Sequence, residues 1–231
     1  MALSTFLIIL VILIILAYFT KKWANGPLNP IKKDLTDKFV IITGSSEGIG
    51  LETAKDLLNS NAKVVFACRN KTKTENAINA LPEKSKKNAI FVQLDLESFK
   101  SIENFSKEIK SKYQKIDILI NNAGMLASKM EKTEDGFINA FQVNYLGNAL
   151  LTLLLLDHFN EKESKIINVS SMAYKMTKLP YGYSKYMDNY NNMMDYYSNL
   201  KKNNVIYADT KLLLVYFSQY MANFLEKNIL I

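Results

Sequence analysis

The chain has 231 residues, of which 48% are hydrophobic and 11% aromatic, so it can bury one sizeable core and is neither disordered nor collagen-like in composition. Its net charge of +7 comes from 29 basic residues spread among 22 acidic ones, which is typical of a solvated surface and argues against nucleic-acid binding. Cys68 is the single cysteine, which excludes an internal disulfide and a cysteine-rich metal site, and its apolar neighbours favour a small core residue.

The N-terminus predicts a membrane anchor over residues 1–20. Leu3–Phe19 is a run of 17 residues without a charge, which at about 1.5 Å per residue nearly crosses a hydrocarbon core of about 30 Å. A cleaved signal peptide is the alternative, but no basic segment precedes the run and no small-x-small cleavage site follows it. Because Lys21 and Lys22 come after the run, the following domain is expected to face the cytosol.

Residues 21–37 are expected to be a linker, since Asn25–Pro30 is rich in Asn, Gly and Pro. From residue 38 onward, short apolar runs alternate with longer helical segments. The apolar runs are each typical of a strand buried on both faces: Phe39–Thr43, Lys63–Ala67, Ile90–Leu94, Ile116–Ile120 and Lys165–Val169. The helix-length segments between them are Ile49–Ser60, Lys71–Leu81, Ser98–Tyr113 and Gly136–Phe159.

This alternation predicts an α/β fold over residues 38–231, with a doubly wound parallel sheet and a ligand site at the carboxyl ends of its strands. Residues 181–204 are rich in Asn, Tyr and Met and predict an inserted loop or a partly ordered segment. His158 is expected to contact carbonyl groups at a helix end. No metal-binding cluster is visible in the sequence.

The segment Thr43–Gly50 joins the first predicted strand to the first predicted helix. Its glycines let the backbone approach a pyrophosphate, which would then lie at the N-terminus of the helix. A glycine-rich turn without a ligand is the alternative. The spacing Thr-Gly-x-x-x-Gly-x-Gly resembles the cofactor loop of the short-chain dehydrogenases/reductases, a family with a Rossmann fold. The resemblance implies cofactor contacts from Gly44, Ser45, Ser46, Glu47, Gly48, Ile49 and Gly50.

Further motifs follow in the order that they have in this family. Asp95, followed by Leu96, resembles the acidic residue that meets the adenine ring. The sequence Asn-Asn-Ala-Gly at 121–124 resembles the segment that stabilises the sheet and lines the cofactor site, which implies cofactor contacts from Asn122, Ala123 and Gly124. Asn144 corresponds to the active-site asparagine, and Ser171 to the serine that orients the substrate.

Two segments resemble one branch of the family in particular. The sequences of Thr133–Phe137 and Leu150–Leu156 are most similar to those of the retinol dehydrogenase-like branch. Members of that branch often act on lipophilic alcohols and carbonyls from a membrane surface. The resemblance therefore implies a small lipophilic, retinoid-, steroid- or lipid-like substrate, a membrane of the endoplasmic reticulum and, as an open alternative, a homodimer.

The chemistry of the family needs a tyrosine and a lysine four residues apart on one helix face, so that the ammonium lowers the phenol pKa and holds the nicotinamide ribose. The chain offers five such pairs: Tyr18/Lys22, Tyr174/Lys178, Tyr181/Lys185, Tyr197/Lys201 and Tyr207/Lys211. Tyr181/Lys185 has the more usual distance from Ser171, but Pro180 and Gly182 flank its tyrosine. We favour Tyr207/Lys211, because an apolar helix follows it, and this choice requires a long insertion after Ser171.

The implied reaction is hydride transfer between a nicotinamide and a carbonyl or alcohol carbon. Tyr207 would be the general acid or base, Ser171 would hold the substrate oxygen, and Lys211 and Asn144 would organise the ribose and a proton relay. NADP(H) is the preferred cofactor and NAD(H) the alternative, since Cys68-Arg69-Asn70 offers no acidic residue after the second strand and Arg69 can bind a 2′-phosphate. Glu47 argues in the other direction, because many NADP-binding relatives have a basic residue near that position.

The end of the chain departs from the family pattern. In the family, the helix with the catalytic tyrosine leads to a sixth strand, a substrate-binding segment and a last strand, whereas this sequence ends at 228–231, where the sixth strand would begin. The fold is therefore expected to be truncated after the active-site helix. The second functional hypothesis is accordingly a truncated or inactive homologue that serves as a cofactor-binding or scaffold protein.

Overall fold

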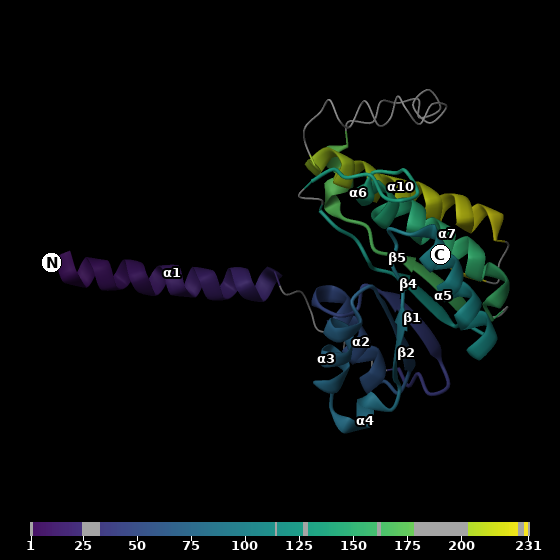
Figure 1. Cartoon of the computed structure of the whole chain (residues 1–231). Coiled ribbons are helices and arrows are strands. Elements are labelled where there is room, and N and C mark those ends of the chain that lie inside the picture. The colour runs from purple at the N-terminus through teal and green to yellow at the C-terminus, as the bar shows by residue number, and fades with distance from the viewer. Residues whose placement is uncertain are drawn as a thin grey trace. The chain divides into compact units, whose positions relative to one another are not determined.

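The computed structural model describes residues 2–24, 33–113, 115–126, 129–160, 163–177, 203–225 and 229–230, which belong to two compact units, Met1–Lys33 and Asp34–Ile231. The first unit contains helix α1, Ala2–Ala24, drawn in purple in Figure 1. Its segment Thr5–Ala24 has a mean hydropathy of 2.2 and no buried residue, so it is long and apolar enough to cross a membrane. The expected apolar helix is confirmed as a membrane-span candidate. Of the linker expected over 21–37, residues 21–24 belong to α1 and residues 25–32 lie outside the described residues.

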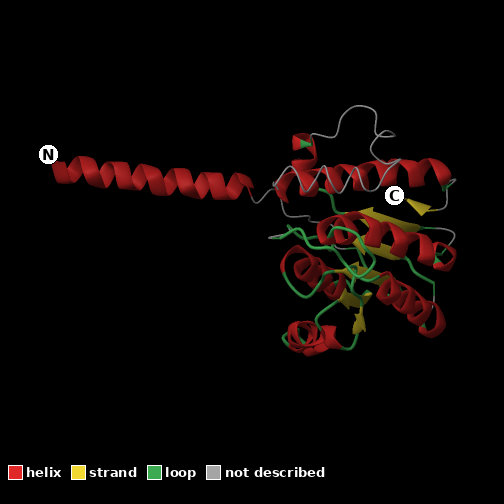
Figure 2. Cartoon of the chain, turned by 45° about the horizontal axis from the view of Figure 1, so that its top comes forward, coloured by secondary structure: helices red, strands yellow, loops and turns green. Residues whose placement is uncertain are grey.

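The described part of the second unit is built on a parallel sheet of six strands (Figure 2). The strands are β1 Phe39–Thr43, β2 Lys63–Cys68, β3 Ala89–Gln93, β4 Ile118–Asn121, β5 Ser164–Asn168 and β6 Ile229–Leu230. Their order in the sheet is β3-β2-β1-β4-β5-β6, so the chain winds outward from β1 in one direction and then, from β4, in the other. This is the doubly wound arrangement that the sequence predicts.

The predicted strands are confirmed to within two residues at each end. Ile229 and Leu230, where we expected the sixth strand of the family to begin, also belong to the sheet. Ile229 and Leu230 pair in parallel with Ser164 and Lys165 of β5. Ile229–Leu230 therefore forms the edge strand of the sheet beside β5.

Helices cover both faces of the sheet (Figure 1). They are α2 Gly48–Asn59, α3 Lys71–Asn79, α4 Glu83–Lys86, α5 Phe99–Lys112, α6 Asn139–Phe141, α7 Gly147–Leu155 and α10 Asn203–Phe224. Side chains alternate along β1: Val40 and Ile42 pack in the core cluster that contains α2, whereas Ile41 packs in the cluster that contains α5 and α7. All three are fully buried, which explains why β1 reads as an uninterrupted apolar run.

The single helix predicted over Gly136–Phe159 is divided in the structure, and this prediction was wrong in its bounds. Gly136 has a φ of +85° and lies in the preceding turn. The helical segment begins at α6, passes through a π-helical turn, η1 at Gln142–Leu146, and continues as α7 and a short 3-10 turn at Leu156–His158. The amide of Gln142 is held by Thr133 and Asp135, a contact that hydrophobic periodicity does not reveal.

The ends of β1 and β4 are tied together by side chains. Thr43 Oγ1, on the last residue of β1, accepts hydrogen bonds from the backbone N–H groups of Asn122 at 3.0 Å and Ala123 at 2.9 Å. In return, Asn122 Nδ2 donates to the carbonyl oxygens of Thr43 at 2.9 Å and Gly44 at 3.1 Å. These bonds continue the sheet beyond the last residue of its two central strands.

We expect Thr43→Val to lower the free energy of unfolding by about 1–3 kcal/mol, because the substitution keeps the side-chain shape but leaves two part-buried N–H groups without their acceptor. Urea unfolding of the chain in neutral detergent measures the change. Thr72→Val, at an exposed position of α3, is the matched control and should change the free energy by less than about 0.5 kcal/mol. Equal effects of the two substitutions would contradict this role of Thr43.

Candidate functional site

A cavity of about 720 Å³ opens at the carboxyl end of the sheet, where β1 and β4 are neighbours and the chain leaves them in opposite directions. Most of the residues that the sequence singles out line it: Gly44, Ser46, Glu47, Ile49, Gly50, Arg69, Asn70, Asp95, Leu96, Asn122, Ala123, Gly124, Ser171, Tyr207 and Lys211. Ser45, Gly48 and Asn144 are not on its wall. The structure thus brings together residues that are up to 167 positions apart in the sequence, from Gly44 to Lys211.

The loop after β1 has the backbone shape that its glycines permit. Gly44 has a φ of +66° and Gly48 a φ of +58°, a region that residues with a side chain rarely adopt. Gly50 is needed for close packing, because a Cβ atom there would lie 2.5 Å from both the Gly44 carbonyl oxygen and Asn122 Nδ2. Glu47, the N-cap residue of α2, makes no side-chain capping bond, so no side chain of this cap competes for the first-turn N–H groups.

Ser45 faces the protein interior rather than the cavity. Its backbone N–H donates to Cys68 Sγ at 3.2 Å, and its hydroxyl donates to the Ile42 carbonyl oxygen at 3.2 Å. Cys68 is 3% exposed, as expected for a small core residue, and its side chain also reaches the cavity wall. The contact holds the loop after β1 against the end of β2.

Two ion pairs lie at the end of the cavity beside β2. Arg69 Nη1 is 3.0 Å from Glu97 Oε1, and Lys73 of α3 pairs with Glu47. The sequence analysis missed Lys73 and Glu97, although both line the cavity. Lys73 could have been found from its place in the first turn of α3, because Asn70 caps that helix by accepting the Lys73 N–H at 2.9 Å.

Asp95 uses its carboxylate within its own loop. Oδ1 accepts the Glu97 N–H at 2.9 Å, and the Asp95 N–H donates to Ser101 Oγ at 2.9 Å. The loop after β3 is therefore held in place, with Asp95 and Leu96 at the cavity wall. This arrangement keeps the backbone of the loop close to the ion pair of Arg69 and Glu97.

Tyr207 and Lys211 lie one helical turn apart on α10. Lys211 is 3% exposed, its Nζ donates to the Val169 carbonyl oxygen at 2.7 Å, and this Nζ is 5.7 Å from the centroid of the Tyr207 ring. Burial lowers the pKa of Lys211. Gly124 leaves room for the ammonium, since a Cβ atom at that position would lie 3.2 Å from Lys211 Nζ.

Of the competing pairs, Tyr18/Lys22 on α1 is the one that lies fully within the described residues. Tyr181/Lys185 and Tyr197/Lys201 lie wholly outside them, and of the pair Tyr174/Lys178 only Tyr174 is described. The helix that contains Tyr207 begins at Asn203, earlier than the apolar run that suggested it. Most of the insertion expected at 181–204 also lies outside the described residues.

Ser171 and Asn144 differ in their access to the cavity. Ser171 follows β5, lines the cavity, and its Oγ accepts the Ala173 N–H at 3.2 Å. Asn144 is fully buried in η1, where its Oδ1 accepts the Met125 N–H at 2.7 Å and its Nδ2 donates to the Met125 carbonyl oxygen at 2.9 Å and to Thr210 Oγ1 at 3.2 Å. Asn144 thus contacts both the loop after β4 and α10.

Ser170 is a further residue that the sequence analysis missed. Its hydroxyl donates to the carbonyl oxygen of Lys211 at 2.8 Å, which fixes α10 against the end of β5. His158, by comparison, lies as expected at a helix end, with Nε2 3.2 Å from the carbonyl oxygen of Tyr113, which caps α5. In the described part of the chain, no three His, Cys, Asp or Glu residues are grouped as they would be around a metal ion.

The sequence model of the short chain dehydrogenase family matches residues 38–186. Retinol dehydrogenase 12 of Mus musculus is 37% identical over 172 residues, which are 74% of this chain and 54% of that protein. Polyprenol dehydrogenase of Homo sapiens is 35% identical over 172 residues, 72% of this chain and 52% of that protein. The chain therefore spans about half the length of these curated relatives.

Solved structures show the same fold. A putative short chain dehydrogenase from Escherichia coli CFT073, complexed with NADPH, superposes with a TM-score of 0.66 at 21% identity, over 87% of this chain and 76% of that one. Because the family model covers well over half of the chain, and the relatives add identities above one third, the assignment rests on sequence as well as on fold. The chain belongs to the short-chain dehydrogenase/reductase family, in its retinol dehydrogenase-like branch.

Proposed function

We propose that the protein is an oxidoreductase that transfers a hydride between a nicotinamide dinucleotide and a carbonyl or alcohol carbon of a lipophilic molecule. The observation that carries this proposal is that Ser171, Tyr207 and Lys211 line the same cavity as the glycine-containing loop after β1. A dinucleotide-binding loop and an acid–base pair are then within reach of one bound ligand.

The residues on the cavity wall fit such a cofactor. The first turn of α2 would hold the pyrophosphate, because its N–H groups meet no capping side chain and the helix dipole favours an anion there. Asp95 and Leu96 would lie beside the adenine, and Asn122, Ala123 and Gly124 would line the path toward Tyr207. When bound, the cofactor supplies or accepts the hydride.

Tyr207 would move the proton at its hydroxyl, donating it in reduction and accepting it in oxidation. Lys211 would favour the phenolate by its charge and would bind the ribose hydroxyls. Ser171 would hold the substrate oxygen. Asn144, which does not line the cavity, would position Met125 and Thr210 by its hydrogen bonds to them. Burial lowers the pKa of Lys211, and its Nζ donates to the Val169 carbonyl oxygen.

Two exposed apolar side chains next to wall residues in the chain support a lipophilic substrate. Leu126 comes directly after the wall residue Met125, and Met172 directly after Ser171, and these two apolar side chains are 60% and 79% exposed. Large apolar groups with this exposure could cover a ligand with little polar surface. The relatives named for retinol and polyprenol point to the same class of substrate.

We further propose NADP(H) as the preferred cofactor. Arg69 and Lys73 are the two cations at the β2 end of the cavity, and each is paired with a carboxylate in an exposed ion pair. Such pairs contribute only about 0–1 kcal/mol, so a 2′-phosphate could replace the carboxylates at small cost. Lys73 also offsets the charge of Glu47, which was the residue that argued against this preference.

For the location, we propose a single-pass anchor over residues 1–20, a linker over 21–37 and a cytosolic domain over 38–231, in the membrane of the endoplasmic reticulum. The apolar helix and the lysines after it support this topology.

A homodimer is also part of the proposal. Light scattering in detergent tests it, and a monomeric mass at micromolar concentration would exclude it.

Tyr207→Phe should reduce turnover by about 10² or more, because it removes a positioned acid–base hydroxyl, while folding and cofactor binding stay nearly unchanged. Lys211→Ala should also weaken cofactor binding, and Tyr181→Phe should have little effect. The assay measures NADPH oxidation with one lipophilic aldehyde or ketone, and direct titration gives cofactor binding. Full activity in Tyr207→Phe with loss in Tyr181→Phe would reverse the assignment. Cofactor binding without turnover in the wild type would favour the scaffold alternative.

NADPH should bind more tightly than NADH, and Arg69→Ala should remove most of that difference because the guanidinium is the cation best shaped for a 2′-phosphate. Lys73→Gln should reduce the difference further. Fluorescence titration of each variant with both cofactors measures it. Lys71→Gln is the control, since Lys71 lies on the same helix, pairs with Glu75 and does not line the cavity. An unchanged ratio of the two affinities in Arg69→Ala would refute the preference.

The proposed topology predicts that Asn70, Asn104 and Asn168, all in Asn-x-Ser/Thr sequons, stay unmodified in cells. Asn70 and Asn104 are exposed, so shielding by the fold would not explain the absence of glycans there. An N-terminal extension that carries a sequon should be glycosylated in the same cells, which shows that the assay detects lumenal sites. A glycan on any of the three native sequons would place the domain in the lumen.

A further inference from the structure

A second hollow, of about 790 Å³, lies at the other end of the sheet, where β1 and β2 begin. Phe39 and Lys63, the first residues of these strands, are register partners and both line it. We call this site the basic hollow, because its wall carries the four lysines Lys63, Lys84, Lys87 and Lys112 but only the single carboxylate of Asp37. Its lysines come from β2, from α4 and the residue after it, and from the end of α5.

The lysines around this end of the sheet differ in their pairing. Lys86 of α4 is 2.6 Å from Glu83 and Lys38 is 3.2 Å from Asp117, and neither of these paired lysines lines the basic hollow. Lys63, Lys84 and Lys87 do line it, and none of them has a carboxylate partner among the described residues. Lys112 is the exception, since it pairs with Glu108 at 2.8 Å.

Like charges around one concave surface repel one another and raise the local positive potential, which concentrates anions there. A lysine on a convex, solvated surface has no such neighbours. The uncompensated charge therefore lies where a bound anion would meet several ammonium groups at once. This arrangement matches an anion that carries more than one charge.

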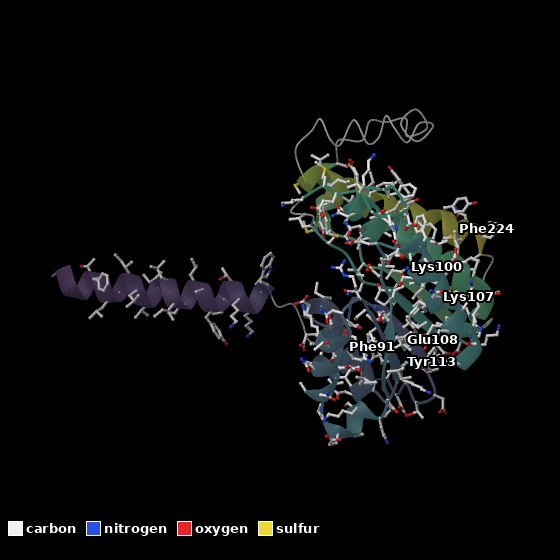
Figure 3. All side chains as sticks on the ribbon, viewed as in Figure 1. Phe91, Lys100, Lys107, Glu108, Tyr113 and Phe224 are labelled. Atoms are coloured by element: carbon white, nitrogen blue, oxygen red, sulfur yellow. The ribbon has the colours of Figure 1, made fainter. Side chains whose placement is uncertain are left out.

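Hydrogen bonds and ring contacts order the wall of the basic hollow. Asn88 Nδ2 donates to the Asn61 carbonyl oxygen at 3.4 Å, and Asn61 Nδ2 donates to Asp34 at 3.0 Å. The rings of Phe39 and Tyr113 stack with their centroids 5.2 Å apart, and Lys63 Nζ lies 5.7 Å from the Tyr113 centroid. Tyr113 is labelled in Figure 3, beside Glu108. The site is thus largely formed before a ligand binds.

We propose that the basic hollow binds a ligand with two or more phosphate charges. Ammonium groups bind phosphate as point charges without a fixed orientation, which suits lysines that come from three different elements. Such a ligand could be a soluble phosphate ester or the phosphorylated headgroup of a lipid. The site is independent of the cofactor cavity, because the two share no lining residue.

The test uses the full chain in neutral detergent and calorimetric titration with inorganic pyrophosphate. NADPH is present at one equivalent per chain, which occupies the cofactor cavity without leaving an excess whose own phosphates would compete for the basic hollow. We expect saturable binding with one site per chain. The triple variant Lys63→Gln, Lys84→Gln, Lys87→Gln should bind pyrophosphate about tenfold or more weakly, because it loses the three lysines that have no carboxylate partner. Its net charge is lower by three, which a control variant can reproduce.

The matched control is Lys100→Gln, Lys107→Gln, Lys165→Gln, which changes the net charge equally at exposed lysines outside the basic hollow. Figure 3 labels Lys100 and Lys107 on α5. This control should bind pyrophosphate within about twofold of the wild type. No saturable binding in the wild type, or an equal loss in the two triple variants, would overturn the proposal. The comparison between variants holds even if NADPH does not bind, which separates this proposal from that of the cofactor cavity.

A second measurement distinguishes a lipid headgroup from a soluble phosphate ester as the ligand. The chain is placed in phosphatidylcholine bilayers with or without a phosphoinositide, and pyrophosphate is titrated again. A lipid source predicts that the phosphoinositide competes and weakens pyrophosphate binding in the wild type. A soluble source predicts equal affinity in both bilayers, and either result requires that the Lys63, Lys84, Lys87 triple variant has lost the site.

Discussion

The hydrogen bonds between the ends of β1 and β4 are the constraint on which the site depends. Two neighbouring parallel strands whose following helices lie on opposite faces of the sheet leave a gap at their carboxyl ends. Without hydrogen bonds across this gap, the loops after the two strands would not be held in place. Thr43 and Asn122 bridge that gap in both directions. The backbone of Gly44 is thereby fixed against Ala123, so close that a Cβ atom on Gly44 would lie 3.0 Å from it. These contacts hold the loop after β1 against the loop after β4 at the cavity wall.

The sequence predicted those parts of the molecule whose structure is local. Strands such as β1 are apolar runs, and Gly44 and Gly48 lie where the loop after β1 turns with a positive φ. Both signals are visible in the sequence without knowledge of tertiary contacts. Tyr207 and Lys211 were chosen over other pairs because a long helix can hold two side chains at a fixed spacing, and α10 places both at the cavity. The roles of these residues in catalysis stay predictions.

The parts that were missed depend on contacts between elements that are distant in the chain. The pairing of Arg69 with Glu97 joins the ends of β2 and β3, and no periodicity in the sequence marks it. The π-helical turn depends on Gln142 being held by a loop, so the helix predicted from apolar spacing alone had the wrong bounds. Asn144 was expected at the site by resemblance, yet it lies behind the cavity wall, where Met125 and Thr210 both bind its amide.

The cations at the two ends of the sheet differ in their pairing with carboxylates. This difference follows from the helix ends that lie there. At the carboxyl end, the helix N-terminus of α2 attracts anions, and the cations beside it are balanced by carboxylates that a ligand could displace. At the amino end, α5 ends, and the carbonyl groups of its last turn offset part of the repulsion among the lysines of the basic hollow. The lysines of the basic hollow are therefore tolerated without carboxylate partners, which lets their charge remain available to a ligand.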